Sequence, residues 1–339
     1  MDDLQDVLLM VDNLKTYFEL FEGTVRAVDG VSFQIKRGRT LGVIGESGCG
    51  KSVTAQSIMR LVPEPPGKIV DGEILLFSDR ENSPNREVVD IAALSTKSKE
   101  IRKIRWNEIS MIFQEPMTSL SPVHTVGSQI VEAIQLHIED VSKAAARERA
   151  IELLDRVGIP QAEHFVDAYS YQFSGGMRQR AMIAMALSCY PRLLIADEPT
   201  TALDVTVESQ ILALIKDLQA EYNMAMMYIS HDLAVVGGVS DDVMVMYLGQ
   251  VVENASVDEI FDSPLHPYTR ALWRSIPTID GSRSRLTPIA GALPSPYRIH
   301  RGCRFYSRCE DVIPGKCDVE PPELVEVTPG HYVRCHRCE

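Results

Sequence analysis

The sequence predicts an α/β fold built on a parallel sheet. Short apolar runs at residues 40–44, 193–197 and 225–230 are typical of buried strands, and a helical period over residues 207–222 separates the last two. A glycine-rich segment near residue 45 also stands between a strand-like run and a helix-like run. Together these observations predict a core of parallel strands connected by helices.

The first part of the chain is rich in predicted strands. Turn residues such as Glu22-Gly23 and Asp71-Gly72 interrupt short apolar runs, which lie at Val7–Val11, Val31–Ile35, Glu73–Phe77 and Ile109–Phe113. The polar, irregular stretch from Ser78 to Ser98 predicts a surface loop inserted between strands.

Helical periodicity replaces this pattern between about residues 126 and 188. Ala150, Leu153 and Val157 fall on one helical face, and Gly158 follows as a helix stop. We therefore expect a helical insertion before the sheet resumes. Strands return within residues 243–252. Beyond about residue 262, proline, glycine, arginine and cysteine become frequent while the periodicity fades, which predicts a boundary there.

Net charge restricts the function classes. The 339 residues carry a formal charge of −13 at pH 7, which argues against a protein that wraps nucleic acid with a basic surface. The acidic start Met1-Asp2-Asp3 lacks the order of a secretory signal, and no apolar run approaches the length of a membrane span. We expect a cytosolic chain whose contact with a membrane, if it has one, is peripheral.

The segment from Gly45 to Ser52 matches the phosphate-binding pattern G-x-x-x-x-G-K-[ST]. A strand-like run precedes it and a helix-like run follows it, which is the context that the motif requires and that a chance match would lack. Its glycines would let backbone amides face phosphate oxygens, Lys51 would reach the β and γ phosphates, and Ser52 would offer a hydroxyl to Mg²⁺. The motif predicts a nucleoside triphosphate as ligand.

Two further patterns contribute side chains to the same chemistry. Asp197 and Glu198 end a buried run. Asp197 would orient Mg²⁺, while Glu198, on the other side of the pleat, would polarise an attacking water. Ser174, Gly175 and Gly176 stand at a predicted helix start, where exposed amides and the helix dipole bind anions such as a γ-phosphate. Each pattern alone also fits a plainer role, as solvated strand-end acids or as a serine N-cap.

In this order, the motifs resemble the ATP-binding cassette of ABC proteins over roughly residues 5–262. Gln114 matches the family's glutamine loop, Asp204 its D-loop and His231 its switch histidine. The resemblance implies an ABC-type P-loop nucleotide-binding domain with a RecA-like core, an antiparallel β subdomain and a helical subdomain at about residues 120–188. It also implies that two cassettes face each other head to tail.

The resemblance implies ATP and Mg²⁺ as ligands and ATP hydrolysis as the activity. Gln114 would ligate Mg²⁺ together with Ser52, and His231 would contact the γ-phosphate. Phe18 would stack on the adenine, with Tyr17 as the second choice. The expected catalytic residues are Glu198, His231 and Lys51, and the remaining nucleotide contacts are Gly45, Glu46, Ser47, Gly48, Cys49, Gly50, Val53, Ser174, Gly175, Gly176, Asp197 and Asp204.

A narrower resemblance concerns transport. The stretches at residues 114–122, 125–127 and 266–272 are similar to those of the ATPase subunits of dipeptide and oligopeptide importers. This implies a heterodimer with a second ABC ATPase subunit, two transmembrane permease subunits and an extracytoplasmic solute-binding protein. The chain would lie peripherally at the cytoplasmic face of the membrane, with no nucleic acid as partner. The transported solute, whether a peptide, a nickel chelate or an oligosaccharide, is not encoded in this chain.

Five of the seven cysteines lie in an expected C-terminal extension at residues 263–339. Four of them resemble the set that holds a [4Fe–4S] cluster in some of these subunits: Cys303, Cys309, Cys317 and Cys335. The wide spacing of the first three favours iron–sulfur over zinc. The pair formed by Cys335 and Cys338 keeps zinc open and leaves open which of the two is the fourth ligand, for which the resemblance selects Cys335. Free buried cysteines are the plainer alternative. The alternative function is a non-transport ABC ATPase whose cysteine-rich tail is regulatory or redox-sensing.

Overall fold

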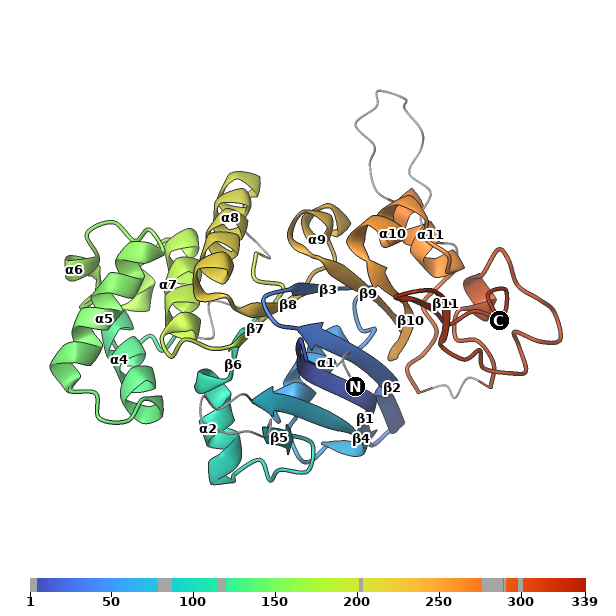
Figure 1. Ribbon diagram of the computed structural model, residues 1–339, viewed down its shortest axis with the longest axis horizontal. Helices are drawn as coiled ribbons and strands as arrows, with labels where there is room; N and C mark the ends of the chain where they lie inside the picture. The colour runs from blue at the N-terminus through green and yellow to red at the C-terminus, as the bar shows by residue number, and fades with distance from the viewer. Residues whose placement is uncertain are drawn as a thin grey trace. The chain divides into compact units, whose positions relative to one another are not determined.

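The structure is a computed structural model (Figure 1), and it describes residues 5–78, 87–114, 120–200, 204–275, 289, 291–297 and 301–339. The chain divides into two compact units, each described by itself. Unit 1 comprises Met1–Leu8, Ile35–Arg39 and Ala93–Ile229, and unit 2 comprises Leu9–Gln34, Thr40–Ala92 and Ser230–Glu339. Both units combine strands with helices, as the predicted α/β class requires.

An antiparallel sheet, most of whose residues belong to unit 2, forms the first part of the chain. It consists of β1 (Val7–Leu20), β2 (Gly23–Lys36), β4 (Gly67–Ser78) and β5 (Glu87–Asp90) in the order β2-β1-β4-β5. β1, β2 and β4 are longer than the predicted apolar runs, because their outer parts mix exposed polar residues with buried ones. The predicted loop at residues 78–98 was partly wrong, because β5 lies inside it and pairs with β4. Residues 79–86 of that stretch lie outside the described residues.

The predicted turn at Asp71-Gly72 is instead an irregularity inside β4. The register between β1 and β4 shifts between Asp12 and Lys15, opposite this point. Gly72 has a φ of 94°, and a Cβ added there would lie 2.5 Å from Asn13 O. Glycine therefore marks a close approach of two strands here and not a chain reversal.

Unit 2 also contains strands of a second sheet, in the order β11-β12-β10-β9-β3. β3 is parallel to β9, and the other neighbours are antiparallel. The strands are β3 (Thr40–Ile44), β9 (Asp242–Tyr247), β10 (Gln250–Ser256), β11 (Val325–Thr328) and β12 (His331–Val333). The helices are α1 (Lys51–Ile58), α9 (Leu233–Val239), α10 (Val257–Asp262), α11 (Pro267–Arg274) and the 3₁₀ turn η3 (Tyr306–Arg308). Because β12 pairs with β10, the C-terminal segment extends the sheet of this unit.

Unit 1 joins parallel strands to a group of helices. The strands β6 (Ile109–Ile112), β7 (Leu193–Asp197) and β8 (Ala225–Ile229) are buried throughout and lie in the order β8-β7-β6. α2 (Lys99–Asn107) precedes β6, and α8 (Val205–Tyr222) connects β7 to β8. The helices expected between residues 126 and 188 are α4 (Val126–His137), α5 (Lys143–Arg156), α6 (Ala162–Phe165), η2 (Ser170–Gln172) and α7 (Gly175–Leu187), drawn in green to yellow-green in Figure 1.

Candidate nucleotide-binding site

The phosphate-binding loop lies between β3 and α1 in unit 2, as the motif predicted. Gly45 has a φ of 152°, and a Cβ added to it would lie 2.3 Å from Met246 O. Gly50 has a φ of 106°, and its Cβ would lie 2.3 Å from Ala27 O. Both positions therefore require glycine. A Cβ at Gly48, by contrast, would meet no atom of the described residues within 4 Å, so the loop faces open space at its middle.

Lys51 begins α1 and is only 5% exposed. Its ammonium group donates hydrogen bonds to Gly45 O at 2.7 Å and to Glu46 O at 3.3 Å, so it lies within the curve of the loop. Ser52 and Val53 follow in the first turn of the helix. A buried ammonium group beside a helix N-terminus favours an anion at this point.

Asp197, Glu198 and Gln114 belong to unit 1. Asp197 ends β7 and is 3% exposed. Glu198 has a left-handed backbone with a φ of 47°, and its N–H donates to Ile229 O at 2.9 Å. Gln114 Nε2 donates to Glu198 Oε2 at 2.9 Å, so two side chains from separate motifs meet. Glu198 is turned by its left-handed backbone and not by the pleat of the strand, which corrects the prediction.

The Ser174 motif opens α7 in unit 1, as predicted. Ser174 Oγ accepts a hydrogen bond from Met177 N at 3.2 Å, which is the usual N-cap contact. A Cβ at Gly176 would lie 3.1 Å from Val207 Cγ1, whereas a Cβ at Gly175 would meet no described atom within 4 Å. Ser174 and Gly175 are exposed, so this helix start has room for a ligand or a second chain.

Asp204 and His231 lie next to other helix starts. Asp204 caps α8 by accepting a hydrogen bond from Val207 N at 2.9 Å, and residues 201–203 of the predicted D-loop lie outside the described part of the chain. His231 is exposed and stands between β8 and Asp232, the N-cap of α9. The roles of Asp204 and His231 toward a nucleotide stay predictions.

Tyr17 and Phe18 occupy adjacent positions of β1 and therefore project to opposite faces of the strand. Tyr17 Oη donates to Asp29 Oδ1 at 2.6 Å, and the Arg26 guanidinium lies 5.4 Å from the centroid of the Tyr17 ring. Burial, together with the Asp29 carboxylate, raises the pKa of Tyr17 to about 12. Phe18 packs beside Gly67, where an added Cβ would lie 2.8 Å from Phe18 Cε1. Of the two aromatic residues, Tyr17 is thus the one engaged in a polar contact.

The C-terminal cysteines lie near enough to influence one another. Burial, helped by the neighbouring Cys317, Cys335 and Cys309 thiols, raises the pKa of Cys303 to about 11. Nevertheless, among the described residues no three His, Cys, Asp or Glu side chains are arranged to hold a metal ion. The predicted [4Fe–4S] site is not supported by this side-chain arrangement, because ligation requires sulfur atoms that converge on one centre.

Comparisons with known proteins identify the family to which the chain belongs. Residues 28–201 match the family model described as ABC transporter, and residues 252–317 match the one described as the oligopeptide/dipeptide transporter C-terminal region. The chain is 51% identical to the oligopeptide transport ATP-binding protein AppD of Bacillus subtilis, over 97% of this chain and 96% of that protein. The chain belongs to the ABC transporter family. It is also 44% identical to the dipeptide transport ATP-binding protein DppD of Escherichia coli, over 97% and 96% of the two chains.

Solved cassettes resemble this ABC transporter chain in fold. The dimeric structure of a post-hydrolysis state of the ATP-binding cassette MJ0796, bound to ADP and Pi, is 26% identical with a TM-score of 0.62, over 74% of this chain and 98% of that chain. The cbiO1 protein of Clostridium perfringens is 28% identical with a TM-score of 0.60, over 76% and 92% of the two chains. The predicted P-loop cassette fold is confirmed. Within the described residues, no helix combines the length and the apolar character needed to cross a membrane.

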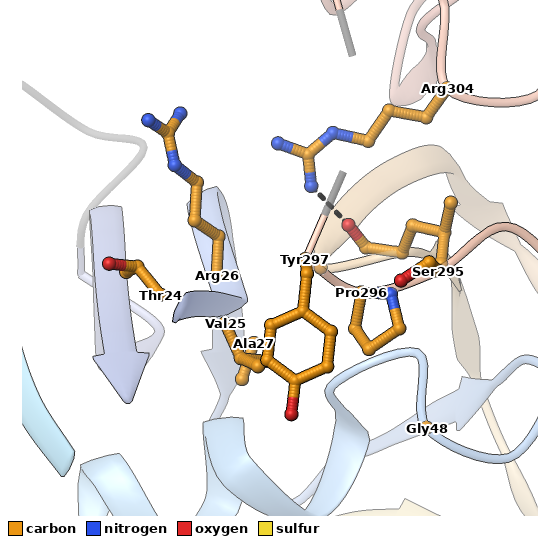
Figure 2. A pocket seen from close by; sticks show the side chains of 11 residues that line it. Thr24, Val25, Arg26, Ala27, Gly48, Ser295, Pro296, Tyr297 and Arg304 are labelled. Atoms are coloured by element: carbon orange, nitrogen blue, oxygen red, sulfur yellow. Dashed lines mark hydrogen bonds between the residues drawn. The ribbon is translucent and has the colours of Figure 1, made fainter. Parts of the chain in front are cut away.

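Sequence reasoning missed a pocket beside the phosphate loop of this ABC transporter chain. Residues 24–27, Gly48, Tyr297 and Arg304 contribute to its lining, and Figure 2 shows these side chains. Arg304 donates a hydrogen bond to the Asp29 carboxylate. No local sequence pattern marks this pocket, because Arg304 and its partner Asp29 are 275 positions apart in the sequence.

Proposed function

We propose that this chain is an ATP-hydrolysing subunit of an ABC importer that takes up a dipeptide, an oligopeptide or a similar solute. The observation that carries this proposal is the 44–51% identity to proteins named for oligopeptide and dipeptide transport, over nearly the whole of each chain. The match of residues 252–317 to the C-terminal region of such transporters supports the same class. The proposed boundaries are a cassette at residues 1–262, with its helical subdomain at about 120–188, and an extension at 263–339.

The proposed chemistry is hydrolysis of MgATP. Lys51 and the loop amides would bind phosphates, and Ser52 and Gln114 would hold Mg²⁺, which neutralises charge on the transferred phosphoryl group. Glu198 would act as a base toward the attacking water, and His231 would contact the γ-phosphate. The hydrogen bond between Gln114 and Glu198 supports these roles, because it brings the proposed metal ligand next to the proposed base. The other proposed nucleotide contacts are Phe18, Gly45, Glu46, Ser47, Gly48, Cys49, Gly50, Val53, Asp197 and Asp204.

A second cassette is proposed to complete each nucleotide site. Ser174, Gly175 and Gly176 would bind the γ-phosphate held by the facing chain, and the open space at Gly175 supports this arrangement. ATP would favour the closed pair, and loss of the γ-phosphate would reopen it. The proposed assembly is a heterodimer with another ABC ATPase subunit, two permeases and an extracytoplasmic solute-binding protein. The chain would lie peripherally at the cytoplasmic face of the membrane.

The cysteine set Cys303, Cys309, Cys317 and Cys335 is proposed to bind a [4Fe–4S] cluster, with zinc as the alternative. Cys303 N donates to Cys317 O at 2.8 Å, so two members of the set lie side by side. Ile313 N also donates to Cys317 Sγ at 3.4 Å, a contact of the kind that stabilises a thiolate ligand. Anaerobic purification followed by metal analysis and visible absorption tests the assignment. Colourless, iron-free and zinc-loaded protein would exclude the iron–sulfur cluster.

Reconstitution tests the transport assignment. The chain is co-expressed with candidate permeases and a candidate solute-binding protein, and the complex is placed in proteoliposomes. Added binding protein and a peptide mixture should accelerate ATP hydrolysis, and peptide should accumulate only when ATP is present. The Lys51→Ala complex is the matched control and should do neither. Failure of the chain to copurify with any permease, or an ATPase rate indifferent to binding protein and peptide, would contradict the proposal.

A further inference from the structure

The C-terminal segment holds Glu46, the second residue of the phosphate-binding loop. Arg308 Nη1 donates to Glu46 Oε2 at 2.6 Å, and Arg308 Nη2 donates to Glu46 Oε1 at 3.0 Å. The Arg308 side chain is 4% exposed and the Glu46 side chain is 28% exposed, so solvent screens the pair only in part. A bidentate pair of this kind fixes the orientation of the carboxylate as well as its distance.

The backbone of Glu46 is restrained as well. Its N–H donates to Tyr268 Oη at 2.9 Å, and its carbonyl accepts a hydrogen bond from Lys51 Nζ at 3.3 Å. Cys49 N donates to the same carbonyl at 3.2 Å. The carboxylate, the amide and the carbonyl of Glu46 all form hydrogen bonds. These bonds hold the beginning of the loop in one conformation.

An aromatic cluster, defined here as Tyr247, Tyr268 and Phe305, supports the residues that hold Glu46. The ring centroids of Tyr247 and Tyr268 are 4.7 Å apart, and Phe305 lies 5.2 Å from the first and 5.3 Å from the second. Arg308 Nη1 also donates to Tyr247 Oη at 3.3 Å. Since Phe305 precedes η3 and Arg308 ends it, the same turn is anchored by apolar contacts and by an ion pair.

We propose that Arg308 is a positioning residue for nucleotide binding, which acts through Glu46 to hold the phosphate loop in the conformation that accepts phosphate. This inference rests on the proposed binding of MgATP by the loop. A loop that already has its bound conformation loses less conformational entropy when the ligand arrives, so its affinity is higher. The turn that carries Arg308 lies between Cys303 and Cys309, so the C-terminal extension contributes directly to the nucleotide site.

A double-mutant cycle on the full-length chain tests the proposal, with the Kd of MgADP measured by calorimetry. Arg308→Met and Glu46→Gln should each raise that Kd by about tenfold, an ordinary size for coupling between linked sites. The double variant should bind no more weakly than the weaker single variant, because Arg308 acts through Glu46. Arg274→Met is the matched control, since Arg274 pairs with exposed Glu310 at 2.9 Å and should leave the Kd unchanged.

The unfolding temperature of each variant shows whether a change in Kd comes from the position of the loop or from a loss of stability. Arg308→Lys keeps the charge and should restore part of the affinity. If Arg308→Met does not fold, Tyr268→Phe serves in its place, because it removes the acceptor for Glu46 N–H and should also raise the Kd. An Arg308→Met protein with a lowered unfolding temperature and an unchanged Kd would overturn the proposal, as would fully additive effects in the cycle. No MgADP binding by the unmodified chain would instead refute the proposed function.

Discussion

Gln114 Nε2 donates a hydrogen bond to Glu198 Oε2 over 2.9 Å, although the two residues are 84 positions apart in the sequence. Gln114 follows β6 and Glu198 follows β7, and these strands are parallel neighbours in which Ile112 pairs with Ala196. Because parallel strands end at the same edge of a sheet, the residues just beyond them meet. The contact brings two motifs that are far apart in the sequence to the same point.

Glu198→Gln should stall ATP turnover while nucleotide affinity stays intact. An amide does not accept the proton of the attacking water, and general-base catalysis contributes about 100- to 10,000-fold, so kcat should fall by a factor in that range. Phosphate release measures kcat, and calorimetry with MgADP measures affinity. An unchanged kcat would exclude Glu198 as the base.

Lys51→Ala should weaken nucleotide binding itself. The substitution removes the positive charge within the loop, together with the hydrogen bonds to Gly45 O and Glu46 O. A hydrogen bond to a charged group contributes about 1.5–3 kcal/mol, so the Kd of MgADP should rise about 10- to 100-fold. Lys143→Ala, at the exposed start of α5, is the control and should bind as the unmodified chain does. Equal affinities for Lys51→Ala and the control would contradict the role of Lys51.

Gly175→Val should block ATP-dependent association with a partner cassette while leaving the single chain folded. A Cβ at Gly175 meets no atom of the described residues within 4 Å, so the single chain should tolerate the change, whereas the valine would clash with a nucleotide held by the proposed facing chain. Sedimentation velocity with and without MgATP, in a Glu198→Gln background that preserves ATP, measures the association. Gly238→Val, at another position where a Cβ meets no described atom within 4 Å, should associate normally. Association that survives Gly175→Val would argue against the facing arrangement.

His266 should make the fold less stable in mild acid. The ring is buried, and burial lowers its pKa to about 3 from an ordinary value of 6.5. Below pH 6.5 the unfolded chain binds a proton at this histidine and the folded chain does not. The contribution of neutral His266 to the free energy of unfolding is therefore fully present above pH 6.5, and it is lost as the pH falls toward 3. The loss should be about 1 kcal/mol one pH unit below the ordinary pKa.

His266→Asn is the variant that checks this pH dependence. His266 Nδ1 accepts a hydrogen bond from Tyr268 N as the cap of α11, and asparagine preserves a cap without titrating. The unfolding temperature of the variant should vary less between pH 6.5 and about 5 than that of the unmodified chain. If the unfolding temperature changes with pH equally in the two proteins, His266 is not the titrating group.

Cys335→Ser and Cys338→Ser should differ in metal content. Both cysteines are partly exposed, so the two substitutions disturb packing to a similar degree. The proposed cluster uses Cys335, and its serine variant should lose iron and visible absorption after anaerobic purification, while Cys338→Ser keeps both. The reverse result would transfer the fourth ligand to Cys338.

Short-range patterns were enough for the parts of the site that depend on near neighbours. The phosphate loop between β3 and α1 and the Ser174 cap of α7 follow from residue types within a few positions, because turns and caps are local structures. The same local patterns gave a wrong prediction at Gly72, where glycine allows β4 to approach β1 closely and does not form a turn. They also missed the strand β5, because its few residues show no clear alternation of apolar and polar side chains.

Residue order alone was therefore sufficient for the fold class, the loop that binds phosphate and the family resemblance. Three-dimensional packing was needed to show that Gln114 meets Glu198 and that Arg308, 262 positions away, holds Glu46. The difference has a physical cause. Backbone turns and helix caps are set by neighbours along the chain, whereas contacts across such separations depend on how strands pair and side chains pack, and no periodic pattern encodes those.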